Sequence, residues 1–214
     1  MSKSKNGEQT RETNTKTRKE KVWLKPEQIS EMRNATVSKS ATYLSARNDS
    51  LIALLADTGL RAGEVVQVQV DWIDFDDGVL VLPGDVQKQY PNGNEPETKR
   101  VGLDPEVRRT LRTYLNSRWK ASDYLFPSRQ SDSMTTESVR NVVKTAAIEA
   151  DVNPYVADGA GQTSPDNVSP HSLRHSVAYR LMNREGEGIY RVKQRLRHSS
   201  VLTTEREYAH FDRV

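Results

Sequence analysis

Three short segments of the chain combine residue types that can bind or transfer a phosphate group. The first is T-G-L-R-A-G-E, which runs from Thr58 to Glu64. Gly59 is placed to end one helix, and a second helix is expected just after Arg61, so the guanidinium projects from a rigid corner. Glu64 is placed to hold nearby backbone or a second basic group. A surface arginine in an ordinary turn is the alternative interpretation of this segment.

The second segment is S-P-H-S-L-R-H-S, from Ser169 to Ser176. His171 and Arg174 are three residues apart on one predicted helix and therefore share a face. Both lie in its first turn, where free backbone N–H groups and the helix dipole favour an anion. The pair is either a phosphate site or an ordinary surface patch. His175 points elsewhere on this helix and is expected to be structural.

The third segment is L-R-H-S-S-V-L-T-T-E-R-E-Y-A-H-F, from Leu196 to Phe211. His198 is expected at the end of one helix and Tyr208 on the next. A tyrosine near a chain end usually packs against a core. Tyr208 gains chemical meaning only if a phosphate and cationic groups lie beside it.

Together the three segments resemble the tyrosine recombinase (phage integrase) family. The family pattern is an arginine in a T-G-L-R-x-x-E turn, a lysine on a β-hairpin, H-x-x-R, and L-x-H-S-S followed about ten residues later by a nucleophilic tyrosine. The resemblance spans residues 23–211 and has its parts in the family's order. The matching residues are Arg61, Lys88 (or Lys99), His171, Arg174, His198 and Tyr208.

The resemblance implies a site-specific DNA recombinase or integrase that cleaves and rejoins strands through a 3′-phosphotyrosine at Tyr208. A tyrosine hydroxyl is a weak nucleophile with a pKa near 10, so it needs proton removal and a cationic setting. Arg61 and Arg174 would hold the phosphate oxygens and follow the added charge of the transition state. His171 would accept the tyrosine proton, and His198 would hydrogen-bond the phosphate. No metal and no cofactor is implied.

Two lysines could protonate the departing 5′-oxygen. Lys88 follows the second predicted strand and lies 27 residues after Arg61, about the separation that the family shows. Lys99 begins the third predicted strand, where relatives often carry a second basic residue. We favour Lys88 and keep Lys99 as the alternative.

The implied partner is double-stranded DNA at specific recombination sites, bound by a homo-oligomer, a tetramer on DNA with a monomer off it. One alternative function is type IB topoisomerase-like relaxation of DNA, which needs no paired sites. The preserved H-x-x-R and L-x-H-S-S segments favour the recombinase. A second alternative is a catalytically inert DNA-binding accessory protein, whose mark would be a missing catalytic residue.

Composition narrows the class of protein further. The 214 residues include no cysteine, which excludes disulfides, thiol catalysis and Cys-based zinc sites and suits a reducing cytosol. The resemblance implies a cytoplasmic, DNA-associated location. No apolar run approaches the ~20 residues of a membrane span. Residues 1–22 carry seven Lys/Arg and three Glu, whereas the remainder carries 25 basic and 26 acidic residues. The strongest basic cluster outside this tail is residues 171–198, with seven Lys/Arg against two Glu.

The elements that must position these residues follow from periodicity and from Gly, Pro and cap signals. We expect an α+β fold, mostly helical, with a small three-stranded antiparallel sheet, similar to a tyrosine recombinase catalytic domain. Residues 1–22 are predicted to be a disordered basic tail and residues 23–214 the catalytic domain, without the family's usual N-terminal core-binding domain. Helices are predicted at 26–33, 41–57, 105–119, 136–150, 170–184, 189–197 and 202–210, and strands at 72–75, 79–82 and 99–103. Residues 151–168 are predicted to be loop.

Overall fold

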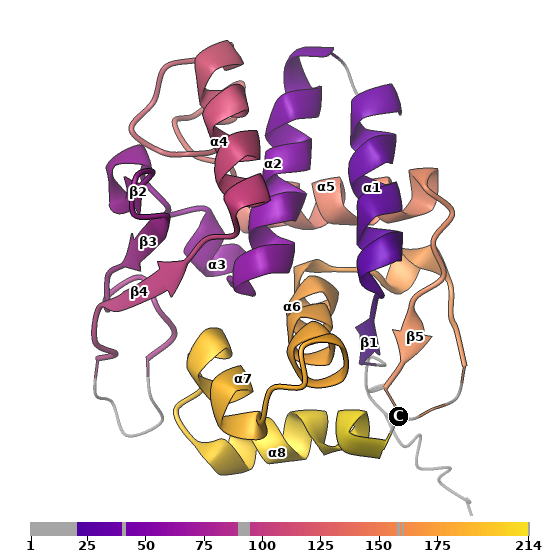
Figure 1. The fold of residues 1–214 in the computed structure, drawn as a ribbon. Coiled ribbons are helices and arrows are strands. Elements are labelled where there is room, and N and C mark those ends of the chain that lie inside the picture. Colours follow the sequence, from indigo (N-terminus) through magenta and orange to yellow (C-terminus); the bar gives the residue numbers. More distant parts are fainter. Residues whose placement is uncertain (1–20, 40–41, 90–94, 158, 160, 214) are drawn as a thin grey trace, which may run out of the picture.

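The computed structural model describes residues 21–39, 42–89, 95–157, 159 and 161–213 (Figure 1). Its helices are α1 (Pro26–Lys39), α2 (Thr42–Thr58), α3 (Ala62–Val65), α4 (Pro105–Ser117), α5 (Thr136–Glu149), α6 (Pro170–Tyr179), α7 (Ile189–Leu196) and α8 (Val201–Tyr208). Its strands are β1 (Val22–Trp23), β2 (Ile73–Asp74), β3 (Val79–Leu82), β4 (Lys99–Gly102) and β5 (Tyr155–Val156). The predicted mostly helical α+β fold is confirmed.

The three-stranded sheet forms as the sequence predicts. Its order is β2-β3-β4 with both pairs antiparallel. Gly78, with φ +68°, supplies the left-handed residue in the β2–β3 turn. Leu80 on β3 faces Val101 on β4, and both side chains are buried. The long connection after β3 carries Lys88.

A second, two-stranded sheet is absent from the prediction. β1 pairs antiparallel with β5, and the Trp23 ring stacks on Tyr155 at 4.8 Å. The prediction of loop alone over residues 151–168 is therefore incomplete. The tail boundary at residue 22 is also wrong, because Val22 is buried within β1. Lys21 is also described, and residues 1–20 lie outside the described residues.

Helix α1 is longer than the sequence predicts. The prediction ends it near Arg33, where the chain turns polar and β-branched, but the helix continues to Lys39. Met32, Ala35 and Thr36 are buried on a helix that packs against α2. Burial of this face stabilises turns whose intrinsic helix propensity is low. The other predicted helices agree with the structure to within a few residues, and a π-helical stretch over Arg180–Arg184 extends α6.

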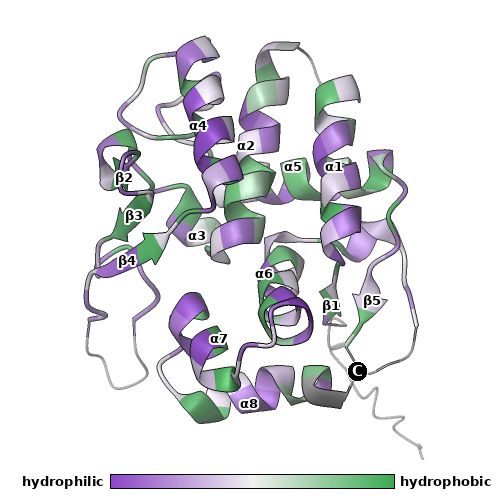
Figure 2. Ribbon diagram, in the orientation of Figure 1, coloured by the Kyte–Doolittle hydropathy of each residue, from purple (hydrophilic) through white to green (hydrophobic). Residues whose placement is uncertain are grey.

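The apolar residues form two clusters. The larger one joins α2, α4, α5 and the β3–β4 hairpin. The smaller one lies between α6, α7, α8 and β1 and includes Tyr208 and Phe211. Figure 1 shows α6 in the middle of the molecule and α7 and α8 at the lower edge of the molecule. In Figure 2 α7 is largely hydrophilic, so a strongly polar helix borders this second cluster.

Candidate active site

The T-G-L-R segment forms a tight corner between α2 and α3. Gly59 has φ +63°, and a Cβ built there would lie 2.6 Å from Leu196 Cδ2, so only glycine fits. Arg61 is extended and occupies the N-cap position of α3. Its side chain is 31% exposed, which leaves the guanidinium open to a ligand.

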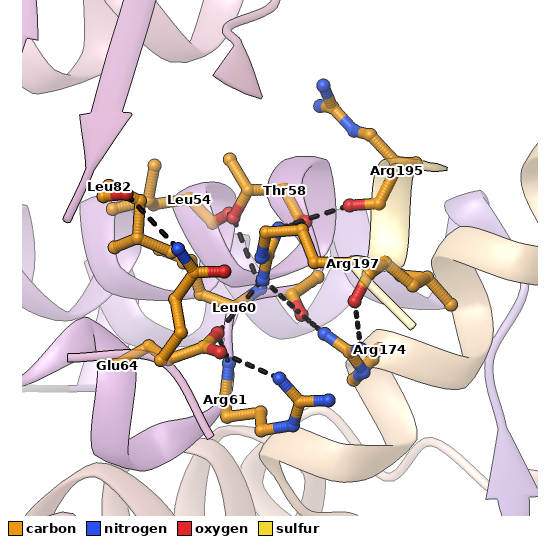
Figure 3. A network of polar contacts seen from close by, with 12 residues as sticks. Leu54, Thr58, Leu60, Arg61, Glu64, Leu82, Arg174, Arg195 and Arg197 are labelled. Atoms are coloured by element: carbon orange, nitrogen blue, oxygen red, sulfur yellow. Dashed lines mark hydrogen bonds and ion pairs between the residues drawn. The ribbon is translucent and has the colours of Figure 1, made fainter. Parts of the chain in front are cut away.

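Glu64 joins two arginines at this corner (Figure 3). Its Oε1 accepts from Arg61 Nη1 at 2.7 Å, and its Oε2 accepts from the Arg61 backbone N at 2.8 Å and from Arg197 Nη2 at 2.9 Å. Burial opposes ionisation of Glu64, but Arg197 and Arg61 together hold its pKa below the usual value. The sequence expectation that Glu64 holds backbone or a second basic group is confirmed on both counts.

Arg174 is the largest fully buried side chain in the described part of the chain. Its Nη1 donates to the Gly59 carbonyl at 2.5 Å and its Nη2 to the Leu196 carbonyl, so α6 is bonded to both the corner and the end of α7. Burial, followed by the nearby charges of Arg61 and Arg197, lowers the pKa of Arg174 to about 9. The guanidinium therefore stays charged at neutral pH.

One pocket brings together three of the predicted site residues. It has a volume of about 270 Å³ and is lined by Arg61, Ala62, Gly63, Arg140, Ser169, Pro170, His171 and Arg174. It opens at the start of α6, where Ser169 forms a capping box with Ser172. Burial, with the Arg174 charge second, lowers the pKa of His171. The pocket is thus lined by three arginines, Arg61, Arg140 and Arg174, and by a neutral imidazole, a set that suits an anion.

Tyr208 ends α8 as a buried side chain of the smaller apolar cluster. Its ring stacks parallel to His198, with centroids 5.9 Å apart. Burial raises the pKa of Tyr208 to about 12, although the charge of Arg174 acts in the opposite direction. In the free protein the hydroxyl therefore keeps its proton at neutral pH.

His198 lies just after α7 and is held in place by α8. Its Nδ1 is 3.0 Å from Thr204 Oγ1. Burial, and after it the charge of Arg174, lowers the pKa of His198 to about 3, so the ring is neutral.

His175 lies closer to the other site residues than the sequence indicates. The expectation that it points elsewhere is wrong, because its ring contacts His171 at 4.4 Å and Tyr208 at 5.3 Å. Its Nε2 is buried without a hydrogen-bond partner. Burial, followed by the His171 charge, lowers its pKa to about 2. The two histidines lie four positions apart on α6, and the adjoining α8 brings Tyr208 against the same face.

The two candidate lysines lie in different surroundings. Lys88 is exposed on the β3–β4 connection and does not line the pocket that holds Arg61. Lys99 begins β4 and pairs with Glu97 at 3.0 Å. It lines a second pocket of about 440 Å³ that also contains Arg197 and His198 but not Lys88. The structure therefore places Lys99 in one pocket with His198, whereas Lys88 lines neither of these two pockets.

Sequence reasoning misses the residues that fix α7. Arg195 donates to Asp57 Oδ1 at 2.5 Å and to the Gly102 carbonyl at 2.7 Å. Asp57 also accepts from the Asp104 backbone N at 2.9 Å. The basic cluster 171–198 contains Arg195 and Arg197, but no feature of the sequence distinguishes them from the exposed arginines around them.

Two further properties concern only the described residues. Among them, no group of three or more His, Asp or Glu side chains is arranged to hold a metal ion. None of their helices combines the length and apolar character needed to cross a membrane.

Comparison with known proteins identifies relatives of this chain. The sequence profile of the phage integrase family matches residues 22–213. Tyrosine recombinase XerC of Erythrobacter litoralis is 32% identical over 175 residues, which are 82% of this chain and 50% of that protein. The chain thus spans about half the length of this relative.

Solved structures show the same fold. The crystal structure of XerA recombinase superposes with a TM-score of 0.66 and 24% identity, covering 87% of this chain and 59% of that one. XerH recombinase bound to palindromic difH substrate gives a TM-score of 0.68 and 21% identity, covering 90% and 50%. The fold implied by the resemblance, that of a tyrosine recombinase catalytic domain, is confirmed.

Proposed function

Because the chain belongs to the phage integrase family, we propose that it is a site-specific DNA recombinase that cleaves and rejoins strands through a 3′-phosphotyrosine at Tyr208. The observation that carries this proposal is the position of Tyr208, stacked on His198 and under the electrostatic influence of Arg174 and Arg61. Its partner is double-stranded DNA, bound by an oligomer, and it acts in the cytoplasm. Relatives named as XerC recombinases support the assignment.

Arg61 and Arg174 are proposed to stabilise the negative charge that develops on the phosphate in the transition state. A phosphodiester gains a second negative charge at its non-bridging oxygens as a nucleophile adds. Arg61 and Arg174 line one pocket, and guanidinium groups bind such oxygens through charge-assisted hydrogen bonds. Donors fixed in place before the reaction stabilise the transition state without reorganisation.

The histidines serve proton transfer and phosphate binding. With its pKa lowered, His171 is unprotonated at neutral pH and accepts the proton of Tyr208, directly or through water. The Thr204 hydroxyl donates either to the Ser200 carbonyl at 3.3 Å or to His198 Nδ1 at 3.0 Å, and in the second arrangement the Nε2–H of His198 is left to donate to a phosphate oxygen. A lysine protonates the 5′-oxygen as it leaves.

Covalent capture tests the proposal on DNA of every sequence at once. The 214-residue protein is incubated with a library of nicked duplexes of random sequence, and DNA that stays attached to protein after denaturation is sequenced. We expect one enriched sequence family, linked through Tyr208, and no captured DNA with Tyr208→Phe, which removes one oxygen and retains DNA binding. DNA binding without capture by the wild-type protein would make it an accessory protein. Relaxation of a plasmid without paired sites would make it a topoisomerase.

A further inference from the structure

Arg197 has a backbone conformation that side chains normally avoid. It follows α7 with φ +56° and ψ +45°, the left-handed position in which helices usually carry glycine. Among the described residues, Asp151, with φ +52°, is the one other non-glycine residue with positive φ. A Cβ in this region is sterically unfavourable. The chain therefore accepts strain at a residue that directly precedes His198.

The side chain of Arg197 makes contacts that offset this strain. It is only 3% exposed, and its Nη2 donates to Glu64 Oε2 at 2.9 Å. Its Nη1 donates to the Thr58 carbonyl at 3.3 Å and to the Arg195 carbonyl at 3.1 Å. Figure 3 shows the guanidinium between the end of α2 and the α3 corner. The left-handed backbone thus places the buried guanidinium of Arg197 against Glu64, which also bonds Arg61.

Glu64 carries one negative charge and has two guanidinium partners. If Arg61 were its only partner, the carboxylate would neutralise the charge that faces the pocket and hold the fork of Arg61 toward itself. With Arg197 on Oε2, the three side chains keep a net charge of +1. The Arg61 side chain gives Glu64 one bond, through Nη1, and it lines the pocket that contains His171 and Arg174.

We propose that Arg197 is a positioning residue for Arg61: by sharing the Glu64 carboxylate, it leaves the charge and the fork of Arg61 available to the scissile phosphate. This inference rests on the proposed recombinase function. It assigns to Arg197 a role that glycine at this position, with a relaxed backbone and no side chain, cannot fill.

Arg197→Gly and Asp151→Gly form a matched pair for the test. Both relieve a left-handed backbone, and Asp151 is exposed and lies beyond α5, away from the pocket. The substrate is a nicked duplex captured by the wild-type protein. We expect Arg197→Gly to lower the single-turnover rate of adduct formation about 10- to 100-fold, less than the 10²–10³ of a direct donor, with DNA affinity little changed. Asp151→Gly should match the wild-type rate, and Arg197→Lys should restore part of it.

A chemical readout separates this role from a structural one. The same duplex is made with a methylphosphonate at the scissile position, which removes the negative charge that Arg61 binds. The deficits of Arg61→Ala and Arg197→Gly should both shrink at least 10-fold on this substrate, and the double variant should be no worse than Arg61→Ala alone. A deficit of Arg197→Gly that is equal on both substrates overturns the inference, as does a wild-type rate in Arg197→Gly. Those results leave the proposed function intact, whereas absence of any adduct from the wild-type protein overturns both.

Discussion

The 5′-oxygen of DNA is a poor leaving group, and its protonation distinguishes the two candidate lysines. A bridging 5′-sulfur has a pKa near that of a cysteine thiol, about 8.5, and leaves without an acid. We expect Lys88→Ala to lose most activity on normal DNA, within the 10²–10⁴-fold range of general acids, and to regain it on the sulfur substrate. Lys99→Ala should lose less and gain little. The measurement is the single-turnover cleavage rate on each substrate.

Arg61→Ala and Arg174→Ala are the controls for this experiment. Their proposed role is to bind the phosphate oxygens, so sulfur at the leaving position should not restore them. The opposite pattern, with rescue of Lys99→Ala, would move the acid to β4, where Lys99 shares a pocket with His198. Rescue of neither lysine variant would indicate another donor, with His171 the next candidate.

Two neutral histidines, the buried His175 and the half-buried His198, predict loss of stability in acid. The pKa is about 2 for His175 and about 3 for His198, below the ordinary 6.5 of an unfolded chain. The unfolded state therefore binds more protons as the pH falls below 6.5, and each histidine lowers the free energy of unfolding by roughly 1.4 kcal/mol per pH unit. Denaturation in urea at pH 7.0, 6.0 and 5.0 measures this slope. His175→Phe should flatten it, and an unchanged slope would show that His175 is protonated in the folded state.

Among the elements, α7 depends on the ion pair that fixes it to α2. Asp57 is 6% exposed and bonds Arg195 and the backbone at the start of α4. Asp57→Asn leaves Arg195 without a counter-charge, which should cost about 3 kcal/mol of unfolding free energy. Asp132→Asn breaks the exposed Lys120–Asp132 pair instead and should cost less than about 1 kcal/mol. Equal losses for the two variants would show that the α7 anchor is not a strong contact.

An element can be predicted from sequence when the residues that determine it lie close together in the chain. Helices α4, α5 and α6 begin at a side-chain N-cap, and proline follows that cap in α4 and α6, so their starts can be found locally. The two-residue strands β1 and β5 are stable only because residues more than 130 positions apart in the chain come together. The extension of α1 likewise depends on α2, which packs against it.

The candidate site likewise contains residues that can be predicted from sequence and residues that cannot. Arg61, His171, Arg174, His198 and Tyr208 can be found because residue type and order mark them. Arg197 cannot, because its role depends on a positive φ and on a partner 133 residues away. The contact of His175 with Tyr208 escapes prediction for a related reason, since it requires the packing of α8 on α6.

For the whole molecule, salt dependence tests whether residues 1–20 bind DNA. They carry six Lys/Arg, and each phosphate contact changes the slope of log affinity against log salt by roughly 0.7–0.9. Deletion of residues 1–20, which keeps Lys21 and β1, should weaken DNA binding and flatten the slope by several units. Cleavage within bound complexes should persist. An unchanged slope would show that these residues do not touch DNA.

The Lys21–Glu207 contact fixes the point from which residues 1–20 extend, and this point lies beside Tyr208. Lys21 Nζ lies 2.5 Å from Glu207 Oε2, and Glu207 directly precedes Tyr208. Twenty residues reach at most about 70 Å, so whatever residues 1–20 hold is confined to a sphere of that radius around the tyrosine. One molecule in this volume corresponds to a local concentration of about 1 mM. A ligand bound by residues 1–20 therefore meets Tyr208 at this local concentration and not at its concentration in bulk solution.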